Sequence, residues 1–143
     1  MLARAKGATQ DVAISYSKVD MEQLQLPPVS FNLVYSSLAL HYVMRLSELL
    51  FEVHRSLVPG GSLVFSVEHP IFTAPANANW FLSADGRNSW PVDSYLDEGP
   101  RLTNWLTKRV IKQHRTLATY VNVLIRLGFV LTHVEEWGQL KSK

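Results

Sequence analysis

The most regular hydrophobic pattern in the chain lies in residues 31–70. Residues 31–36 form a nearly continuous apolar run of strand length, which is typical of a strand that is covered on both faces. Apolar residues then recur at helical spacing over 45–57, and charged residues occupy the opposite face. The Pro-Gly-Gly turn at 59–61 ends this helix, and residues 63–67 resume as a second buried strand. A strand, a crossover helix and a second strand in direct succession predict a βαβ unit of a parallel sheet.

Weaker patterns on both sides of this unit predict further elements. Residues 12–18 are β-rich and fit a short strand, a helix over 116–128 begins at a capping Thr and ends at Gly, and 129–134 follow as a last strand. Over residues 71–113 the periodicity disappears, so we expect short strands or helical turns that form a cap over one edge of the sheet. The whole chain, residues 1–143, is expected to be a single domain with this cap inserted in it.

Composition and charge narrow the class of protein. With 143 residues and 47% hydrophobic content, the chain has the size and the apolar side chains of one globular domain. Its formal net charge of +2 is spread without a block, so we expect no nucleic-acid partner. No apolar run approaches the roughly 20 residues that span a bilayer, and no signal-peptide core is present, so we expect no membrane association. The absence of cysteine excludes disulfides and thiolate chemistry and fits a cytoplasmic protein.

The ends of the predicted strands select candidate functional residues. In an open α/β sheet, ligands bind beyond the carboxyl ends of the strands, near the point where the strand order reverses. Three groups of residues follow the predicted strands: Asp20 and Met21; Ser36, Ser37, Leu38, His41 and Tyr42; and Glu68 with His69. We therefore expect these groups to meet in one crevice.

Several short runs occur in a fixed order along the chain: Asp20-Met21, Phe31-Asn-Leu-Val, Tyr35-Ser-Ser-Leu-Ala-Leu-His-Tyr, His54-Arg55-Ser-Leu-Val-Pro-Gly-Gly, Ser66-Val-Glu-His-Pro, His114-Arg115-Thr and Leu127-Gly-Phe. Together they resemble the class I S-adenosylmethionine-dependent methyltransferases, in particular bacterial enzymes that act on small molecules. The resemblance implies an α/β, Rossmann-like doubly wound sheet, S-adenosylmethionine as the cofactor, and transfer of its methyl group to a small-molecule acceptor. A nucleotide-dependent oxidoreductase uses the same kind of sheet and is the weaker alternative.

The start of the chain departs from the family pattern. A complete family member begins with a strand, a Gly-rich turn and a strand that ends in an acidic residue, whereas residues 1–6 here resemble the helix that follows them. We therefore expect a partial methyltransferase domain, truncated at its N-terminus. The alternative function is a non-catalytic module that exposes an unfinished sheet edge and binds a partner, or a second copy as a homodimer.

The resemblance implies that two groups of residues bind the cofactor. Asp20 would accept a hydrogen bond from the adenine amino group, with Met21 beside it. Ser36, Ser37 and Leu38 would lie beside the amino-acid moiety. The structural alternative for Asp20 is a loop aspartate that turns the chain by bonding to its own backbone.

The candidates for catalysis and acceptor binding come from the strand ends and the cap. Those for catalysis are His41, Glu68, His69 and His114, and those for the acceptor pocket are Tyr42, Trp80, Trp90, Trp105 and Arg115. An imidazole can take a proton from a nucleophilic acceptor, because its unperturbed pKa is about 6.5. The structural alternatives are that His41 caps the start of a helix and that His114 and Arg115 form a solvated pair before the last helix. The histidines show no metal-ligand spacing such as His-Glu-x-x-His, so no metal is predicted.

Overall fold

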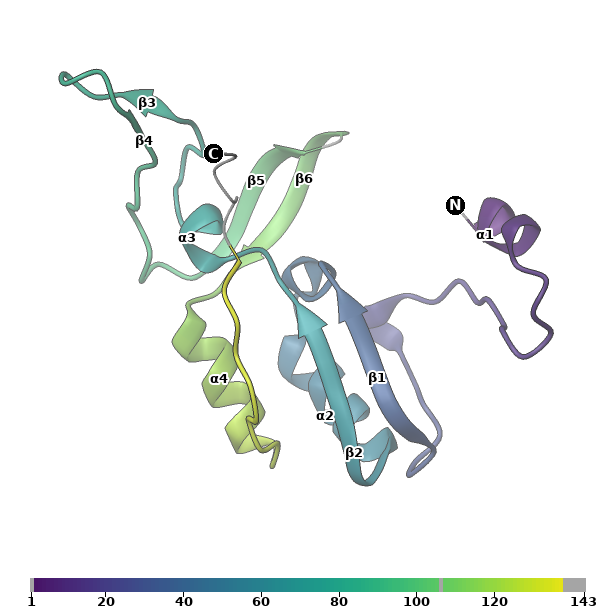
Figure 1. Ribbon diagram of the computed structural model, residues 1–143. Coiled ribbons are helices and arrows are strands. Elements are labelled where there is room, and N and C mark those ends of the chain that lie inside the picture. Colours follow the sequence, from purple (N-terminus) through teal and green to yellow (C-terminus); the bar gives the residue numbers. More distant parts are fainter. Residues whose placement is uncertain (1, 106, 138–143) are drawn as a thin grey trace.

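The computed structural model describes residues 2–105 and 107–137. Its centre is a βαβ unit, in which β1 (Phe31–Ser37) pairs in parallel with β2 (Leu57–Ser66) and α2 (Leu46–Ser56) connects them (Figure 1). The predicted strand, helix and strand are therefore confirmed. The apolar stripe of α2 is buried in the core, and this burial stabilises a helix that would be marginal on its own.

Strand β2 begins earlier than the sequence pattern predicts. Phe31 of β1 pairs with Leu57, whereas Leu33 pairs with Ser62, so the register shifts between these two pairs. Gly60 lies in the shifted stretch with a φ of +79°, a conformation that glycine adopts without steric cost. The Pro-Gly-Gly segment is therefore an irregularity within β2 and not a turn ahead of it.

Two predicted strands, 12–18 and 129–134, are wrong. The first segment contains only a turn, and the second has no regular secondary structure. Both sequences are β-rich, but a strand also needs a neighbouring strand to satisfy its backbone N–H and C=O groups. Each sheet in the described residues has two strands, and neither segment belongs to one.

Residues 71–113 contain the short strands and the helical turn that the sequence predicts. The elements are α3 (Pro70–Thr73), the hairpin of β3 (Phe81–Leu82) and β4 (Asn88–Ser89), and the hairpin of β5 (Gly99–Trp105) and β6 (Thr107–His114). In Figure 1, α3 and the β5–β6 hairpin lie above the carboxyl ends of β1 and β2. This region therefore stands over the edge of the sheet at which a ligand is expected.

The remaining helices differ in how firmly they pack. Helix α4 (Leu117–Arg126) begins at Thr116, whose side chain accepts the amide of Thr119, and it is followed by Gly128 with a φ of +91°, as predicted. Helix α1 (Leu2–Ala8) has no buried residue. The short 3-10 helices η1 (Met21–Gln23) and η2 (Leu40–Tyr42) precede and follow β1. No helix in the described part of the chain is long and apolar enough to cross a membrane.

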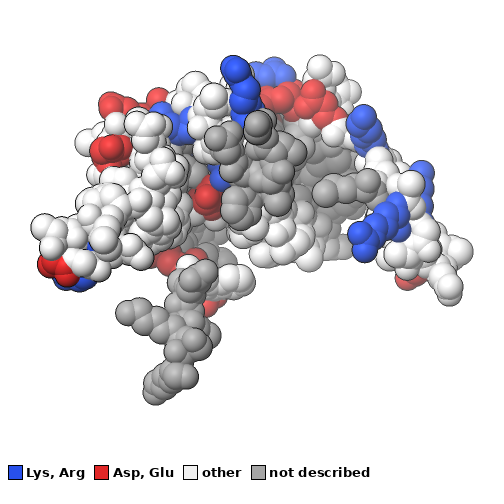
Figure 2. Space-filling model, turned by 90° about the horizontal axis from the view of Figure 1, so that it is seen from above, with Lys and Arg blue, Asp and Glu red and all other residues white. Residues whose placement is uncertain are grey.

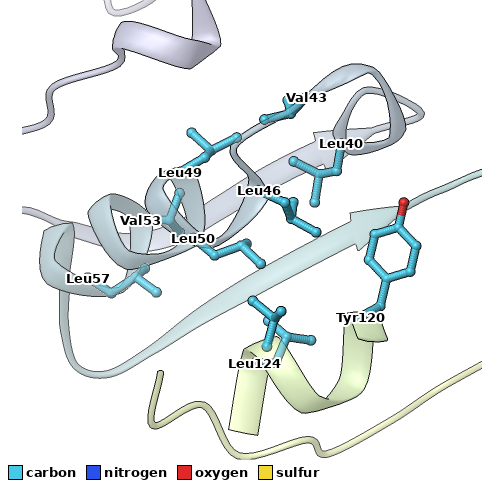
Figure 3. Close-up of a cluster of buried hydrophobic side chains, with 10 residues drawn as sticks. Leu40, Val43, Leu46, Leu49, Leu50, Val53, Leu57, Tyr120 and Leu124 are labelled. Atoms are coloured by element: carbon cyan, nitrogen blue, oxygen red, sulfur yellow. The ribbon is translucent and has the colours of Figure 1, made fainter. Parts of the chain in front are cut away.

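The core lies between the sheet and two helices that share one of its faces. Buried side chains of α2 and α4 meet there, among them Leu50, Val53, Val123 and Leu124 (Figure 3). Strands β1 and β2 contribute partly buried apolar side chains to the same cluster. In Figure 1 both strands lie in front of α2, so the viewer sees the face of the sheet that carries no helix.

Candidate functional site

The carboxyl ends of β1 and β2 are joined by hydrogen bonds. The amide of Leu38 donates to the carbonyl oxygen of Ser66 at 3.0 Å and lies 3.2 Å from Ser66 Oγ, while the hydroxyls of Ser37 and Ser66 are 3.5 Å apart. Leu38 has a φ of +49°, which is unusual for a residue with a side chain and turns the chain away from the strand. Ser37 and Leu38 thus lie at one strand end with Ser66, as the strand-end rule predicts.

Three polar side chains from distant parts of the chain meet beside these strand ends. His41 of η2 is only 3% exposed, and its Nδ1 accepts the amide of Glu68 at 3.3 Å. Lys112 of β6 is 5% exposed, and its Nζ donates to Glu68 Oε2 at 2.5 Å. The side chain of Glu68 remains 31% exposed. Glu68 therefore has a buried cationic partner on one side and access to solvent on the other.

Burial and a hydrogen bond determine the protonation state of His41. Burial lowers the pKa of His41; Glu68 raises it and Lys112 lowers it by smaller amounts. The ring is therefore neutral near pH 7, and because Nδ1 accepts a hydrogen bond, its proton is on Nε2. In this form His41 can donate a hydrogen bond to a ligand from Nε2. The same atom cannot take a proton from the ligand, because it already carries one.

His69 has a structural contact on each ring nitrogen. Its Nδ1 accepts the amide of Ile71 at 3.2 Å and so caps the start of α3. Its Nε2 lies 2.6 Å from Glu136 Oε1, in the segment that follows Gly128. His69 thus joins α3 to that segment, and its carboxylate partner is Glu136 and not the neighbouring Glu68.

His114 lies inside the protein and also has both ring nitrogens engaged. It is fully buried, with Nδ1 at 2.8 Å from the hydroxyl of Thr73 and Nε2 at 2.9 Å from the carbonyl oxygen of Tyr95. Its ring meets the ring of Tyr95 edge to face, with 5.7 Å between the centroids. The structure thus places His114 in the contact between β6, α3 and the loop before β5.

Arg115 and Glu22 hold the same turn from two sides. Arg115 Nη2 donates to the carbonyl oxygens of Val43 and Met44 at 2.6 and 2.8 Å. The carboxylate of Glu22 accepts the amides of Met44 and Arg45 at 2.5 and 3.1 Å. Nη1 of Arg115 is buried and has no hydrogen-bond partner among the described residues. The turn between η2 and α2 is therefore fixed by side chains from η1 and from the start of α4.

Tyr120 of α4 extends from the core towards these polar groups. Its ring belongs to the hydrophobic cluster, and its hydroxyl lies at the end of the ring that is farthest from α4 (Figure 3). Burial raises the pKa of Tyr120, and the nearby guanidinium of Arg115 opposes this shift. Tyr120 therefore remains neutral and can donate or accept a hydrogen bond.

The predicted cofactor-binding residues of η1 lie beside α2. Asp20 caps η1, because its Oδ1 accepts the amide of Glu22 at 3.0 Å. Its Oδ2 has no hydrogen-bond partner among the residues that the structure describes. Met21 borders an open hollow of about 640 Å³, whose other walls come from residues 22–25 and from α2 and the residue before it. The loop interpretation of Asp20 is thus realised by one of its two carboxylate oxygens.

Aromatic side chains of the predicted acceptor pocket cluster on α3. The indole N–H of Trp90 donates to the carbonyl oxygen of Ile71 at 2.8 Å, and its ring lies 5.6 Å from that of Phe72 and 5.2 Å from that of Trp80. Trp80 is 61% exposed. Tyr42 is exposed as well, and its ring contacts that of His41 at 4.3 Å. Trp105 is one of residues 104–108, whose side chains lie outside the described part of the protein.

Lys112, which contacts Glu68, and Glu22, which contacts Met44 and Arg45, are not among the candidates that the sequence suggested. Lys112 is two positions before His114 in β6, so both side chains lie on the same face of the hairpin. Recognition of this strand would have placed a cation on the buried face beside His114. Glu22 follows directly after the Asp20-Met21 pair but lies 22 positions from Met44, and no local pattern indicates that contact.

No group of three or more His, Asp or Glu side chains that could hold a metal ion occurs in the described residues. The histidines considered as ligands instead have three different sets of partners. Seen from above, Lys and Arg are mixed with Asp and Glu over the surface (Figure 2). The visible charges of this face therefore do not form one large area of a single sign.

Comparison with known proteins places this geometry in a family. Residues 1–65 match the family model of a methyltransferase domain. The crystal structure of an S-adenosylmethionine-dependent methyltransferase from Mesorhizobium loti is 55% identical, with a TM-score of 0.91 over 96% of this chain and 63% of that chain. The chain belongs to the class I S-adenosylmethionine-dependent methyltransferases. This methyltransferase chain is also similar to a protein of Listeria monocytogenes assigned to the same enzyme class, at 37% identity and a TM-score of 0.85 over 93% of this chain and 63% of that chain.

Two curated proteins match the same methyltransferase chain over most of its length. An uncharacterized protein of Haemophilus influenzae is 34% identical over 114 residues, and a malonyl-[acyl-carrier protein] O-methyltransferase of Enterobacter lignolyticus is 30% identical over 115 residues. Each match covers 78% of this chain but only 45% and 38% of the two relatives. The chain therefore spans less than half the length of these curated relatives. The resemblance to class I methyltransferases and the Rossmann-like α/β fold are both confirmed.

Proposed function

We propose that this chain takes part in S-adenosylmethionine-dependent methyl transfer to a small-molecule acceptor, at the carboxyl ends of β1 and β2. The observation that carries the proposal is the meeting of Ser37 and Leu38 with Ser66, and of His41 with Glu68 and Lys112, at this edge. Membership of the methyltransferase family and the usual position of ligands in open α/β sheets support it. The modest net charge of +2 and the mixed surface charges in Figure 2 support a small acceptor over a nucleic acid.

The residues of η1 and of the β1 turn fit the adenosine side and the amino-acid side of the cofactor. Asp20 keeps one carboxylate oxygen that can accept a hydrogen bond from an amino group, and the side chains of Met21 and Leu38 are exposed and apolar. Ser36 and Ser37 add hydroxyls at the strand end. S-adenosylmethionine supplies a methyl group that its sulfonium already activates, so the protein has to position more than to activate it.

The acceptor would lie between Glu68 and the aromatic side chains of the cap. Glu68 is the one predicted catalytic residue whose side chain is partly exposed while a cation holds one of its oxygens. We propose that Glu68 takes the proton of an acceptor O–H or N–H, while His41 donates a hydrogen bond from Nε2 to the bound ligand. Tyr42, Trp80 and Trp90 would enclose the acceptor. In this proposal His69, His114 and Arg115 position the surrounding segments, since their polar atoms already contact the protein.

The cofactor assignment is tested by calorimetric titration of this chain with S-adenosylhomocysteine. Asp20→Asn keeps an oxygen that can cap η1 but replaces the free acceptor oxygen by an amide, and Asp20→Ala removes both. We expect each variant to bind at least roughly tenfold more weakly, the effect of losing one hydrogen bond to a charged group. Asp11→Ala is the matched control, because Asp11 also accepts an amide two residues ahead and lies in the segment between α1 and η1.

The possible results separate two claims. Equal affinity of wild type and both Asp20 variants would contradict the adenine contact while leaving cofactor binding intact. No measurable heat with the wild-type chain would contradict the proposal that these residues bind the cofactor by themselves.

A further inference from the structure

Lys112 carries a positive charge into the interior of the protein, beside the proposed acceptor site. Only 5% of the residue is exposed, and its Nζ donates to Glu68 Oε2 at 2.5 Å. A buried ion pair is a weak source of stability, because the cost of removing two charges from water can exceed the attraction between them. The contact of Lys112 with the carboxylate that is proposed as the base therefore points to a role in the site.

Glu68 has two possible cationic partners, which are Lys112 and a protonated His41. Strand β6, which carries Lys112, packs against η2, which carries His41. The carboxylate of Glu68 raises the pKa of His41 and the ammonium of Lys112 lowers it, so both charges lie close to the ring. The nearby guanidinium of Arg115 is bound to carbonyl oxygens of the turn after η2. His41 and Lys112 are buried by the described residues themselves, so no further segment is needed to form these contacts.

We propose that Lys112 is a positioning residue of the acceptor site, which binds Glu68 and thereby keeps His41 neutral with its proton on Nε2. This inference rests on the proposed function, in which His41 donates from Nε2 and Glu68 takes a proton. In a charged ring, Nδ1 would carry a hydrogen and could no longer accept the amide of Glu68. The charged ring would instead form an ion pair with the carboxylate. Lys112 prevents this pairing, so the hydrogen-bond donor and the base remain two separate groups.

Proton–nitrogen correlation NMR of the complete chain, labelled in its histidine rings, tests the proposal. The spectra report the tautomer and the protonation midpoint of each ring, and the signal that is lost in His41→Gln belongs to His41. We expect a neutral wild-type ring with its proton on Nε2 near pH 7. Lys112→Met keeps the side-chain length but leaves Glu68 to His41, so the midpoint should rise by about one pH unit. Arg109→Met is the control, because it removes an exposed cation from the same strand and should leave the midpoint unchanged.

Two further variants keep the test decisive if Lys112→Met does not fold by circular dichroism. Glu68→Gln removes the carboxylate that favours the charged ring, so the midpoint of His41 should fall. Lys112→Arg keeps the cation and should retain the wild-type midpoint and tautomer.

Two kinds of result would overturn the proposal. One is a wild-type His41 ring that is charged near pH 7 or carries its proton on Nδ1. The other is an unchanged midpoint in folded Lys112→Met or in Glu68→Gln, as expected if Lys112 only fills space in the interior. The spectra need neither cofactor nor acceptor, so this failure is distinguishable from a failure of the S-adenosylhomocysteine titration, which tests the proposed function.

Discussion

At the scale of single residues, the structure changes the roles that the sequence suggested for the histidines. All three have Nδ1 in a contact with a donor from a nearby segment, and two of them have Nε2 against an oxygen of the protein. Such contacts could not be predicted, because the partners are separated by up to 67 positions along the chain. The types of residue at the strand ends could be predicted, since they follow directly from where the strands stop.

Replacement of Lys112 by Met should destabilise the protein by about 2 kcal/mol. The substitution keeps the length of the side chain but leaves the partly buried carboxylate of Glu68 without its cation. Urea denaturation measures the loss, and Glu68→Gln in the same background should recover part of it because no unpaired charge remains. Arg87→Met is the control, since the Arg87 pair with Asp85 is well exposed and its loss should cost less stability than the loss of Lys112. Equal losses in the two variants would contradict the special environment of Glu68.

The lowered pKa of His41 predicts how stability depends on pH. Because burial disfavours the charged ring, folded His41 binds its proton less readily than unfolded His41, whose ordinary pKa is 6.5. Its contribution is complete above pH 6.5 and is lost as the pH falls from that value through the lowered pKa of the folded state. Urea midpoints across this range should therefore decrease towards acid.

Variants separate this titration from that of other histidines. His41→Gln should flatten the decrease, because glutamine carries no titratable proton, while His133→Gln should retain it, because His133 is exposed. An unchanged pH profile in His41→Gln would show that another group is responsible.

At the scale of elements, local sequence signals predicted the helices correctly, but they did not predict which segments pair as strands. The helix over 46–56 and the helix over 117–126 follow from apolar periodicity and from a capping Thr and a Gly close to their ends. Segments 12–18 and 129–134 have strand-like sequences, but whether they pair depends on neighbours that the sequence does not specify. The β5–β6 hairpin was expected only as unspecified short strands, because its residues show no clear alternation.

The start of α4 offers a test at this scale. Thr116 caps the helix through Thr119 and also contacts Glu98 at 2.8 Å with its amide and its hydroxyl. Thr116→Ala should lower the free energy of unfolding by about 1 kcal/mol, whereas Thr116→Ser should have little effect because it keeps the hydroxyl. Thermal or urea unfolding distinguishes the two. A loss of the same size in both variants would assign the effect to the methyl group and not to the cap.

At the scale of the whole molecule, the polar groups at one edge of the methyltransferase sheet are in contact with one another. Helices of the described residues cover only one face of that sheet. The chain corresponds to 63% of the length of two solved structures. The strand ends, the β5–β6 hairpin and α4 form one connected region, which contains the proposed acceptor site.

The backbone of Met44 connects η1 with the start of α4 in a way that can be observed directly. Its N–H is held by Glu22 from the cofactor side and its C=O by Arg115 from the start of α4. An amide that is bonded to a carboxylate exchanges its hydrogen with solvent only when that contact opens. The exchange rate at this single position thus reports how often η1 detaches from the rest of the protein, in solution and without any ligand.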